Sequence, residues 1–291
     1  MLHTLKNGIL TVEINDCGAE LFSVRRDECE YLWQGDPAYW AGRAPNLFPI
    51  CGRLYEGVYT WENKTYEMIL HGFAKASDFR PVRISDAEMR FVLEADEETK
   101  KSYPFDFVFT VSYRLNGNKI ETELSAVNTG DSLLPFAWGA HPGFNVPLGG
   151  NGDFSDYVLE FSEPCSPDEL IFSDDLHLNT GKKRAYPLLD GRRLPLSHRL
   201  FDTDAIFLSR VADTVTLRSE KSARYVTFHY PEFPYLGIWH APKSDAPYVC
   251  IEPWCGLPAY HEVTDDFATK SDMFRILPGE SKAARYEIAF G

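Results

Sequence analysis

The segment FDFVFTVSYRLNGNKIETELSA, residues 105–126, carries the clearest structural signal in the chain. Residues 105–115 and residues 120–126 each place an apolar or small side chain at every second position. Such alternation predicts two strands with one buried face. The Asn-Gly-Asn turn between them, residues 116–118, predicts that the strands form an antiparallel hairpin. The segment therefore places an antiparallel sheet at the centre of the fold.

Similar but shorter alternating segments recur along the rest of the chain, separated by turn residues, and no long helical period is visible. This pattern predicts a large all-β antiparallel sandwich. No stretch has the composition of a linker and no internal repeat is visible, so we expect one domain over residues 1–291. Prolines and charges make residues 162–200 a predicted loop-rich region. Further strands are expected at residues 10–14, 19–24, 89–95, 157–161, 201–208, 214–218, 224–230, 235–240, 247–252, 272–277 and 283–290.

The charge of the chain excludes some partners. Its formal net charge is −14, and its basic residues cluster only in two short runs, at 182–184 and 192–193. Proteins that bind nucleic acids need a positive surface against the phosphates, so no nucleic-acid partner is expected. No apolar run is long enough, at about 20 residues, to span a membrane, so no membrane partner is expected either.

The cysteines and the first residues indicate the compartment. Residues 1–14 lack the contiguous apolar core of a signal peptide. The six cysteines show neither a CxxC motif nor a paired zinc spacing. We therefore expect reduced cysteines that act as small core residues, and a cytoplasmic location.

The segment AWGAHPGFN, residues 137–145, is the first candidate for chemistry. It follows an alternating apolar segment that ends at Trp138, so His141 lies where a buried strand ends. Pro142 restricts the backbone of His141 to an extended form, and Gly143 allows a sharp turn after it. An imidazole held in this way needs a function or a hydrogen-bond partner, although a structural histidine is also consistent with the pattern.

A carboxylate occupies the corresponding place in YVCIEPWCG, residues 248–256. Glu252 ends an apolar strand and precedes Pro253. If Glu252 is buried, desolvation raises its pKa toward the range of a general base. If its strand lies at a sheet edge, the charge simply meets solvent.

Other polar or aromatic residues share a position at strand ends among apolar neighbours: Arg53, His71, Asp204 and Trp239. Of the remaining histidines, His229 and His240 lie in predicted strands near aromatics and are possible lining residues. Four others lie in polar surroundings and suggest no role: His3, His177, His198 and His261.

In order and approximate spacing, five segments resemble the aldose 1-epimerase (galactose mutarotase-like) family, and its LacX-like branch most closely. The resemblance covers essentially the whole chain, and its most specific parts are His-Pro-Gly-Phe-Asn and Glu-Pro-Trp. It implies the large β-sandwich of that family, the galactose mutarotase-like supersandwich. The segments are residues 46–53, 71–73, 141–145, 201–205 and 252–254.

The resemblance also implies a reaction. Mutarotases interconvert the α and β anomers of a hexose by opening and reclosing its ring. The family's motifs assign Glu252 as the base for the O1 hydroxyl and His141 as the acid for the ring oxygen O5, with no metal and no cofactor. They assign hydrogen bonds to the monosaccharide to Arg53, His71 and Asp204, and an apolar floor beneath the sugar to Trp239.

The chain departs from the better-known galactose mutarotases in two places. It lacks their longer arginine-containing loop before the first histidine. Its 201–205 segment contains both Asp202 and Asp204, which strand spacing cannot separate because positions two apart share a face. We prefer Asp204, which directly precedes Ala205. These departures concern the identity of the sugar more than the reaction.

Three alternatives remain at this point. The first is a hexose-6-phosphate mutarotase, which needs arginines such as Arg43 and Arg53, or the basic residues 182–193, to hold the phosphate. The second is a non-catalytic carbohydrate-binding protein on the same scaffold. The third is a metal-dependent hydrolase with His71, His141 and Glu252 as ligands, which no metal-binding motif supports.

Overall fold

The hairpin predicted at residues 105–126 forms strands β10 (Phe107–Asn116) and β11 (Lys119–Asn128) of the computed structural model, which describes residues 1–175 and 177–291. Buried and more exposed residues alternate along both strands, as the sequence pattern predicts. Residues 117 and 118 form the connecting turn, and Gly117 has a φ of 58°. Two-residue hairpin loops need positive φ angles of this kind, which glycine adopts without strain.

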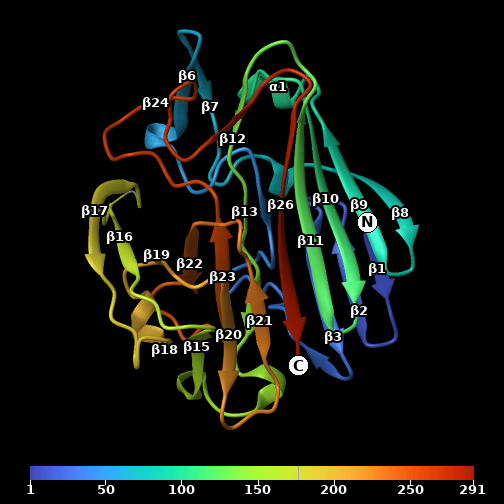
Figure 1. Ribbon diagram of the computed structural model, residues 1–291, viewed down its shortest axis with the longest axis vertical. Helices are drawn as coiled ribbons and strands as arrows, with labels where there is room; N and C mark the ends of the chain where they lie inside the picture. Colours follow the sequence, from blue (N-terminus) through green and yellow to red (C-terminus); the bar gives the residue numbers. More distant parts are fainter. Residues whose placement is uncertain (176) are drawn as a thin grey trace.

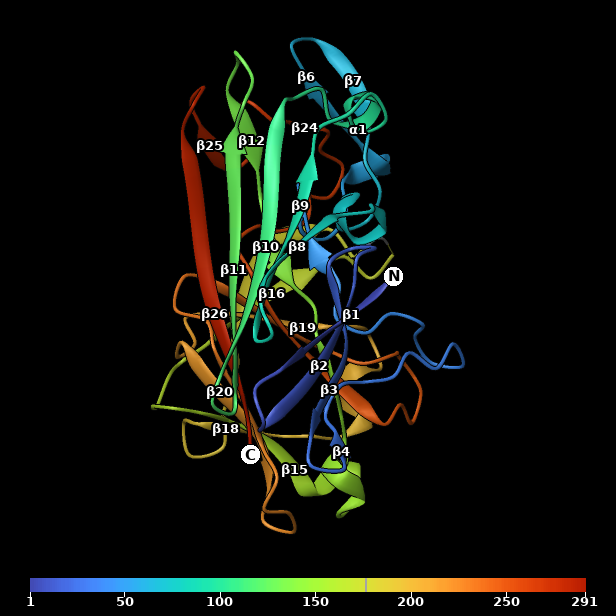
Figure 2. The ribbon, with the colours of Figure 1, turned by 90° about the vertical axis from the view of Figure 1, so that its right-hand side faces the viewer.

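This hairpin belongs to a nine-stranded sheet in which every pairing is antiparallel. Figure 2 shows the long strands β10, β11 and β26 lying side by side. The strand order is β18 (Arg193–Pro195), β15 (Tyr157–Phe161), β20 (Thr214–Ser219), β21 (Val226–His229), β26 (Ser281–Phe290), β11, β10, β9 (Glu88–Glu94) and β8 (Arg80–Ser85).

A second sheet, of eight strands, contains two of the six predicted site residues, Trp239 and Glu252, and Figure 1 shows its strands β22 (Tyr235–Trp239) and β23 (Tyr248–Trp254). Every residue of its strand β23 is buried, because the sheet is covered on both faces there. Strand β14 (Gly143–Asn145) also pairs with β23. The other strands follow the order β17 (Asn179–Ala185), β16 (Asp168–Phe172), β19 (Ile206–Ser209), β22 (Tyr235–Trp239), β23 (Tyr248–Trp254), β13 (Gly139–Ala140) and β5 (Asn46–Leu47).

Three smaller sheets and a few helical turns complete the described part of the chain. No helix there is both long and apolar enough to cross a bilayer. The small sheets are β1 (Leu2–Lys6), β2 (Leu10–Asn15), β3 (Glu20–Arg26) and β4 (Cys29–Glu30); β12 (Leu134–Phe136) and β25 (Phe274–Ile276); and β24 (Asp265–Asp266), β6 (Val58–Trp61) and β7 (Lys64–Glu67). The helical turns are α1 (Thr99–Ser102), η1 (Tyr55–Gly57), η2 (Ala74–Ala76), η3 (Leu148–Gly150), η4 (Phe154–Asp156) and η5 (His198–Phe201).

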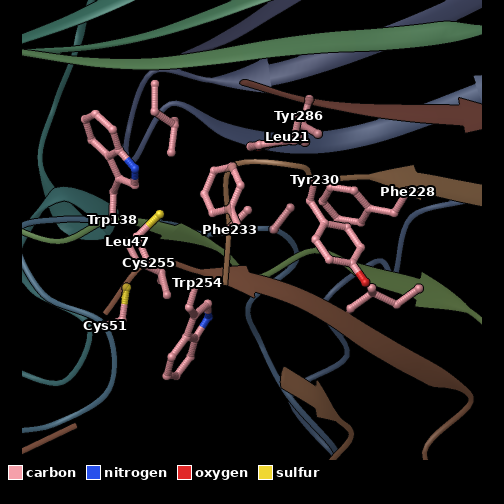
Figure 3. Close-up of a cluster of buried hydrophobic side chains, with 14 of the residues drawn as sticks. Leu21, Leu47, Cys51, Trp138, Phe228, Tyr230, Phe233, Trp254, Cys255 and Tyr286 are labelled. Carbon is pink, nitrogen blue, oxygen red and sulfur yellow. The ribbon is translucent and has the colours of Figure 1, made fainter. Parts of the chain in front are cut away.

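The hydrophobic core lies between the two large sheets. Phe144 of β14 packs edge-on against Phe228 of β21, and Phe48, which follows β5, stacks on Phe109 of β10 with a centroid distance of 4.3 Å. Figure 3 shows part of this core, with labelled side chains from both sheets. Aromatic rings bury the largest apolar areas of any side chains, so these contacts hold the two layers together. The predicted all-β sandwich is confirmed.

Residues 162–200, predicted as loop-rich, also contain three strands that the sequence pattern did not predict, β16, β17 and β18. Strand β17 lies at the edge of the eight-stranded sheet and is exposed at its last five residues. A strand with solvent on both faces needs no apolar alternation, so its charged sequence gave no strand signal. The predicted strand at 201–208 is also shorter than expected, because η5 occupies its beginning and β19 starts only at Ile206.

Candidate active site

One pocket gathers the residues singled out in the sequence. Its volume is about 450 Å³, which lies in the size range of small-molecule sites. Side chains from β22 and β23 line it, together with residues from the loops after β5, β7 and β13. All six predicted site residues are among its lining residues: Arg53, His71, His141, Asp204, Trp239 and Glu252.

The register of the eight-stranded sheet places His141 and Glu252 opposite each other. Gly139, two residues before His141, pairs with Trp254, two residues after Glu252. A second pair lies the same distance away on the other side, at residues 143 and 250. Residues 141 and 252 lie midway between these pairs, so their side chains are neighbours across the strands. The His141 Nε2 atom lies 3.2 Å from the Glu252 Oε2 atom.

Glu252 is a fully enclosed carboxyl group. It is 1% exposed, and its Oε1 atom has no hydrogen-bond partner among the described residues. Gly237 pairs with it on the neighbouring strand β22, where a Cβ atom would come within 3.2 Å of the Glu252 Cβ. The glycine therefore leaves room for the glutamate side chain. Burial raises the pKa of Glu252 well above its usual value, and the negative charge of Asp204 raises it further.

The His141 ring is held by other aromatic rings. It lies 5.0 Å from the Trp40 ring, 5.7 Å from the Trp239 ring and 5.5 Å from the His71 ring, measured between centroids. Its backbone N–H donates to the carbonyl oxygen of Pro45. Burial lowers the pKa of His141 from 6.5 to about 3. The ring is thus fixed in place and favours its neutral form.

The pKa shifts of His141 and Glu252 oppose an ion pair between the two side chains. A separation of 3.2 Å between Nε2 and Oε2 would suit an ion pair. Burial, however, penalises the charged form of both groups. Both shifts therefore favour a neutral imidazole and a neutral carboxylic acid over an ion pair, and the 3.2 Å separation lets a proton move between Oε2 and Nε2.

His71 is fixed by the backbone of Gly52. The backbone N–H of His71 donates to the Gly52 carbonyl oxygen at 2.7 Å. The Nδ1 atom of the His71 ring accepts from the Gly52 backbone N–H at 3.0 Å. The acceptor role of Nδ1 requires the proton of the neutral ring to be on Nε2. Burial lowers the pKa of His71 well below its usual value. The Nε2–H group is therefore a fixed neutral donor for a ligand.

The turn that carries His71 depends on glycine. Gly72 has a φ of 73°, and a Cβ atom at this position would clash with the carbonyl oxygen of Phe48. Only glycine combines this backbone angle with so close an approach. The His-Gly-Phe motif is therefore explained by packing against the segment that leads to Arg53.

Asp204 forms a small network at the other side of the pocket. Its Oδ1 accepts from the Trp239 indole N–H at 2.7 Å, and its Oδ2 lies 3.3 Å from the Nδ1 of His177. Asp204 has a φ of 112°, a backbone angle that L residues rarely adopt. Asp202 is exposed and does not line the pocket, because the two residues follow η5 in a turn rather than in a strand. Strand spacing therefore did not apply to them.

Arg53 and Lys75 are two cationic residues of the pocket wall. Within the described ranges, neither side chain has an ion pair or hydrogen bond to protein. Lys75 lies in η2, four residues after His71, and burial lowers its pKa. Glu20, another lining residue, uses its Oε1 atom to accept the backbone N–H groups of Arg43 and Ala44.

Of the basic residues considered for a phosphate site, only Arg53 lines the pocket. The Arg43 guanidinium stacks on the Phe22 ring at 3.6 Å and donates to the Phe22 carbonyl oxygen and to Gln34. In the basic segment 182–193, Arg184 pairs with Glu169, and no residue of the segment lines the pocket.

Sequence reasoning missed several lining residues and proposed two that lie elsewhere. His229 bonds to Thr214 on the nine-stranded sheet, and His240 is buried against His198 and Phe201. His177, by contrast, lines the pocket although its polar surroundings suggested no role. Its position in a charged segment gave no signal. Lys75 lies only four residues after His71, and this short separation could have indicated that Lys75 is near the pocket. The other missed lining residues include Glu20, Trp40 and Trp254.

The fold and the pocket together define the family. The sequence model of the family described as aldose 1-epimerase matches residues 1–289. The chain belongs to the aldose 1-epimerase family.

Individual relatives agree with this assignment. The chain is 35% identical over 296 residues to "Protein LacX, chromosomal" of Lactococcus lactis subsp. lactis, covering 98% of this chain and 97% of that protein. It is similar to the solved structure of a galactose mutarotase related enzyme from Lactobacillus acidophilus, with a TM-score of 0.94, 33% identity and coverage of 100% and 97% of the two chains. A galactose mutarotase-like protein from Lactobacillus casei ATCC 334 has a TM-score of 0.94, 32% identity and full coverage of both chains.

Proposed function

We propose that the protein is a mutarotase that interconverts the α and β anomers of a free hexose, with Glu252 as the base and His141 as the acid. The observation that carries this proposal is the 3.2 Å contact between the two side chains in the wall of a sugar-sized pocket. The oxygens O1 and O5 are both bonded to C1 of the sugar. A base for O1 and an acid for O5 must therefore lie close together.

Ring opening removes one proton from O1 and adds one proton to O5. The Glu252 carboxylate takes the proton of O1 while the His141 imidazolium gives a proton to O5, and the C1–O5 bond breaks. The products are the open-chain aldehyde, a protonated Glu252 and a neutral His141. Burial favours the neutral forms of both side chains, so the pocket stabilises the complex with the open-chain aldehyde. Rotation about C1–C2 and the reverse transfers close the ring on its other face.

Ring opening requires the charged forms of both groups, which the ligand helps to stabilise. The Oε1 atom of Glu252 and the Nδ1 atom of His141 are buried without a partner among the described residues. A sugar hydroxyl that donates to Oε1 favours the carboxylate. Acid and base assistance of this kind is worth about 10²–10⁴-fold in rate.

The remaining contacts would orient the sugar. Asp204 is held by Trp239 and His177 and is a charged acceptor for hydroxyl groups. His71 offers its Nε2–H, and Arg53 adds a cationic donor. The indole rings of Trp40 and Trp239 provide apolar surface for the C–H face of the ring.

Polarimetry tests the proposal. Freshly dissolved α-glucose or α-galactose is followed by optical rotation with and without the protein, and a parallel sample contains a chelator. We expect acceleration that persists with the chelator. Binding of the sugars without acceleration would instead indicate a non-catalytic binding protein, and acceleration abolished by the chelator would indicate a metal-dependent enzyme.

One observation favours a second candidate, mutarotation of a phosphorylated hexose. Arg53 and Lys75 line the pocket, and neither has an anionic partner within the described ranges. Two such cations near the catalytic pair would hold a phosphate group by charge-assisted hydrogen bonds. The same polarimetric assay with glucose 6-phosphate distinguishes the candidates, because acceleration for the phosphate ester alone would replace the first proposal.

A further inference from the structure

A third potential ligand lies beside the catalytic pair. The side chains of His141, Cys250 and Glu252 each offer one donor atom, and these atoms lie within 4.8 Å of one another. Cys250 is 0% exposed and does not line the pocket, so its thiol lies behind the pair. The proposed reaction assigns this thiol no role.

Sheet register explains why the three side chains meet. Cys250 and Glu252 are two residues apart on β23, so their side chains lie on the same face. His141 lies between β13 and β14, which both pair with β23. The set is therefore held by hydrogen-bonded strands, and its spacing does not depend on a loop.

The side chains also have free coordination capacity. The His141 Nδ1 and Glu252 Oε1 atoms are buried and have no hydrogen-bond partner among the described residues. Glu252 is 1% exposed and His141 is 8% exposed. Buried polar atoms normally have partners, so these two atoms call for an explanation such as a catalytic role or a bound ion.

We propose that His141, Cys250 and Glu252 form an inhibitory binding site for a thiophilic divalent cation, for which Zn²⁺ is the probe. Thiolate, imidazole and carboxylate are the three ligand types of zinc sites, and three protein ligands leave one tetrahedral position open to the pocket. Ligand atoms of a tetrahedral zinc site lie about 3.5–4 Å apart. Side-chain movements of about 1 Å would therefore bring the three donor atoms to coordination distance. Coordination releases two protons to solvent, one from the Cys250 thiol and one from the Glu252 carboxyl group.

Inhibition follows from the identity of the ligands. A cation bound to Glu252 occupies the lone pair that would accept the O1 proton. A cation bound to His141 prevents protonation of the imidazole, which then has no proton to give to O5. The proposal treats the cation as an inhibitor and gives it no part in ring opening. The inhibition rests on the proposed mutarotase function, whereas cation binding does not.

Cobalt and zinc test the proposal separately. Co²⁺ bound to a thiolate gives a charge-transfer absorption band in the near ultraviolet, so chelator-treated protein is titrated with Co²⁺ in an absorption spectrometer. We expect the band with the wild-type protein and its loss in Cys250→Ala. Zn²⁺ should displace the Co²⁺ and slow mutarotation, and Cys250→Ala should need about tenfold or more Zn²⁺ for the same inhibition.

The controls separate binding from folding and from activity. Cys29→Ala removes another buried cysteine, on β4, that is outside the pocket lining and should leave the band unchanged. Cys250→Ser must behave like Cys250→Ala, and near-ultraviolet circular dichroism checks that both are folded. Absence of the band in the wild-type protein, or equal Zn²⁺ inhibition of folded Cys250→Ala, would overturn the proposal. The band remains decisive even if no sugar is turned over.

Discussion

His141 faces Glu252 across two strands that are hydrogen-bonded on both sides of the pair, with Nε2 and Oε2 3.2 Å apart. A sheet ladder fixes such a distance more firmly than a loop does, because each strand residue is held by its neighbours. Substitutions at this pair and at the residues around it should therefore have separate, measurable effects.

Glu252→Gln should remove the base and keep the shape of the side chain. We expect the rate of mutarotation to fall about 10²–10⁴-fold. The melting temperature should not decrease, because the amide is neutral at every pH, whereas Glu252 must bind a proton to be buried in its neutral form. Polarimetry and thermal unfolding measure the two quantities. Glu160→Gln, on the surface beside Arg218, is the matched control. A Glu252→Gln protein with near-normal rates would refute the assigned role.

His141 should make the stability of the protein depend on pH. Its pKa is 6.5 in the unfolded chain and about 3 in the folded protein. As pH falls from 6.5 toward 3, the unfolded chain binds a proton at this position before the folded protein does. The free energy of unfolding therefore decreases over this window. Urea unfolding at several pH values should show a shallower decrease for His141→Asn than for the wild type. Equal slopes would contradict the burial of a neutral ring.

Asp204→Asn should weaken substrate binding more than it disturbs the fold. The asparagine oxygen can still accept from the Trp239 indole, but it lacks the charge that strengthens hydrogen bonds to sugar hydroxyls. We expect KM to rise about tenfold. Asp202→Asn is the matched control, since Asp202 is exposed and outside the pocket lining. A larger effect at Asp202 would reverse our preference between the two residues.

Lys75→Met should distinguish neutral from phosphorylated substrates. The substitution keeps much of the length of the side chain and removes its charge. If a hexose phosphate is the substrate, KM for the ester should rise about tenfold or more, while KM for glucose changes little. Lys64→Met, on the exposed strand β7, is the control. Unchanged kinetics with the ester would remove Lys75 from the phosphate hypothesis.

Gly72→Ala should destabilise the turn that carries His71. The added Cβ meets the Phe48 carbonyl, which is backbone and cannot rotate away. We expect a loss of about 2–4 kcal/mol in the free energy of unfolding. Gly8→Ala is the control, because its φ is also positive, at 85°, but no heavy atom lies within 4 Å of the added Cβ. It should lose only about 1–2 kcal/mol. Chemical denaturation compares the two, and equal losses would exclude the clash as the cause.

The fold could be predicted where one face of a strand is buried and the other is not. Strands β10 and β11 alternate along their length because they lie within the nine-stranded sheet and face the core. Strand β17 lies at a sheet edge, so its sequence of Gly, Lys, Lys and Arg has no apolar face to reveal it. The prediction failed where burial did not constrain the side chains.

The site was predictable only in part for a related reason. His141 and Glu252 interrupt buried segments, so they stand out as polar residues among apolar neighbours. His177 occurs in a polar segment, and only the folding of the chain brings it to the pocket lining. The choice between Asp202 and Asp204 likewise needed the turn geometry after η5, which strand spacing cannot supply.

The position of the proposed acid and base beside the sheet ladder separates two tasks within the molecule. The ladder around β23 sets the spacing of the pair, while Arg53, Lys75 and Asp204 come from connecting segments outside that ladder. Under the proposed mechanism, substitutions in these segments would change which sugar is accepted without moving the two groups assigned to proton transfer. Selectivity for the substrate could then diverge while the proposed chemistry at C1 remains the same.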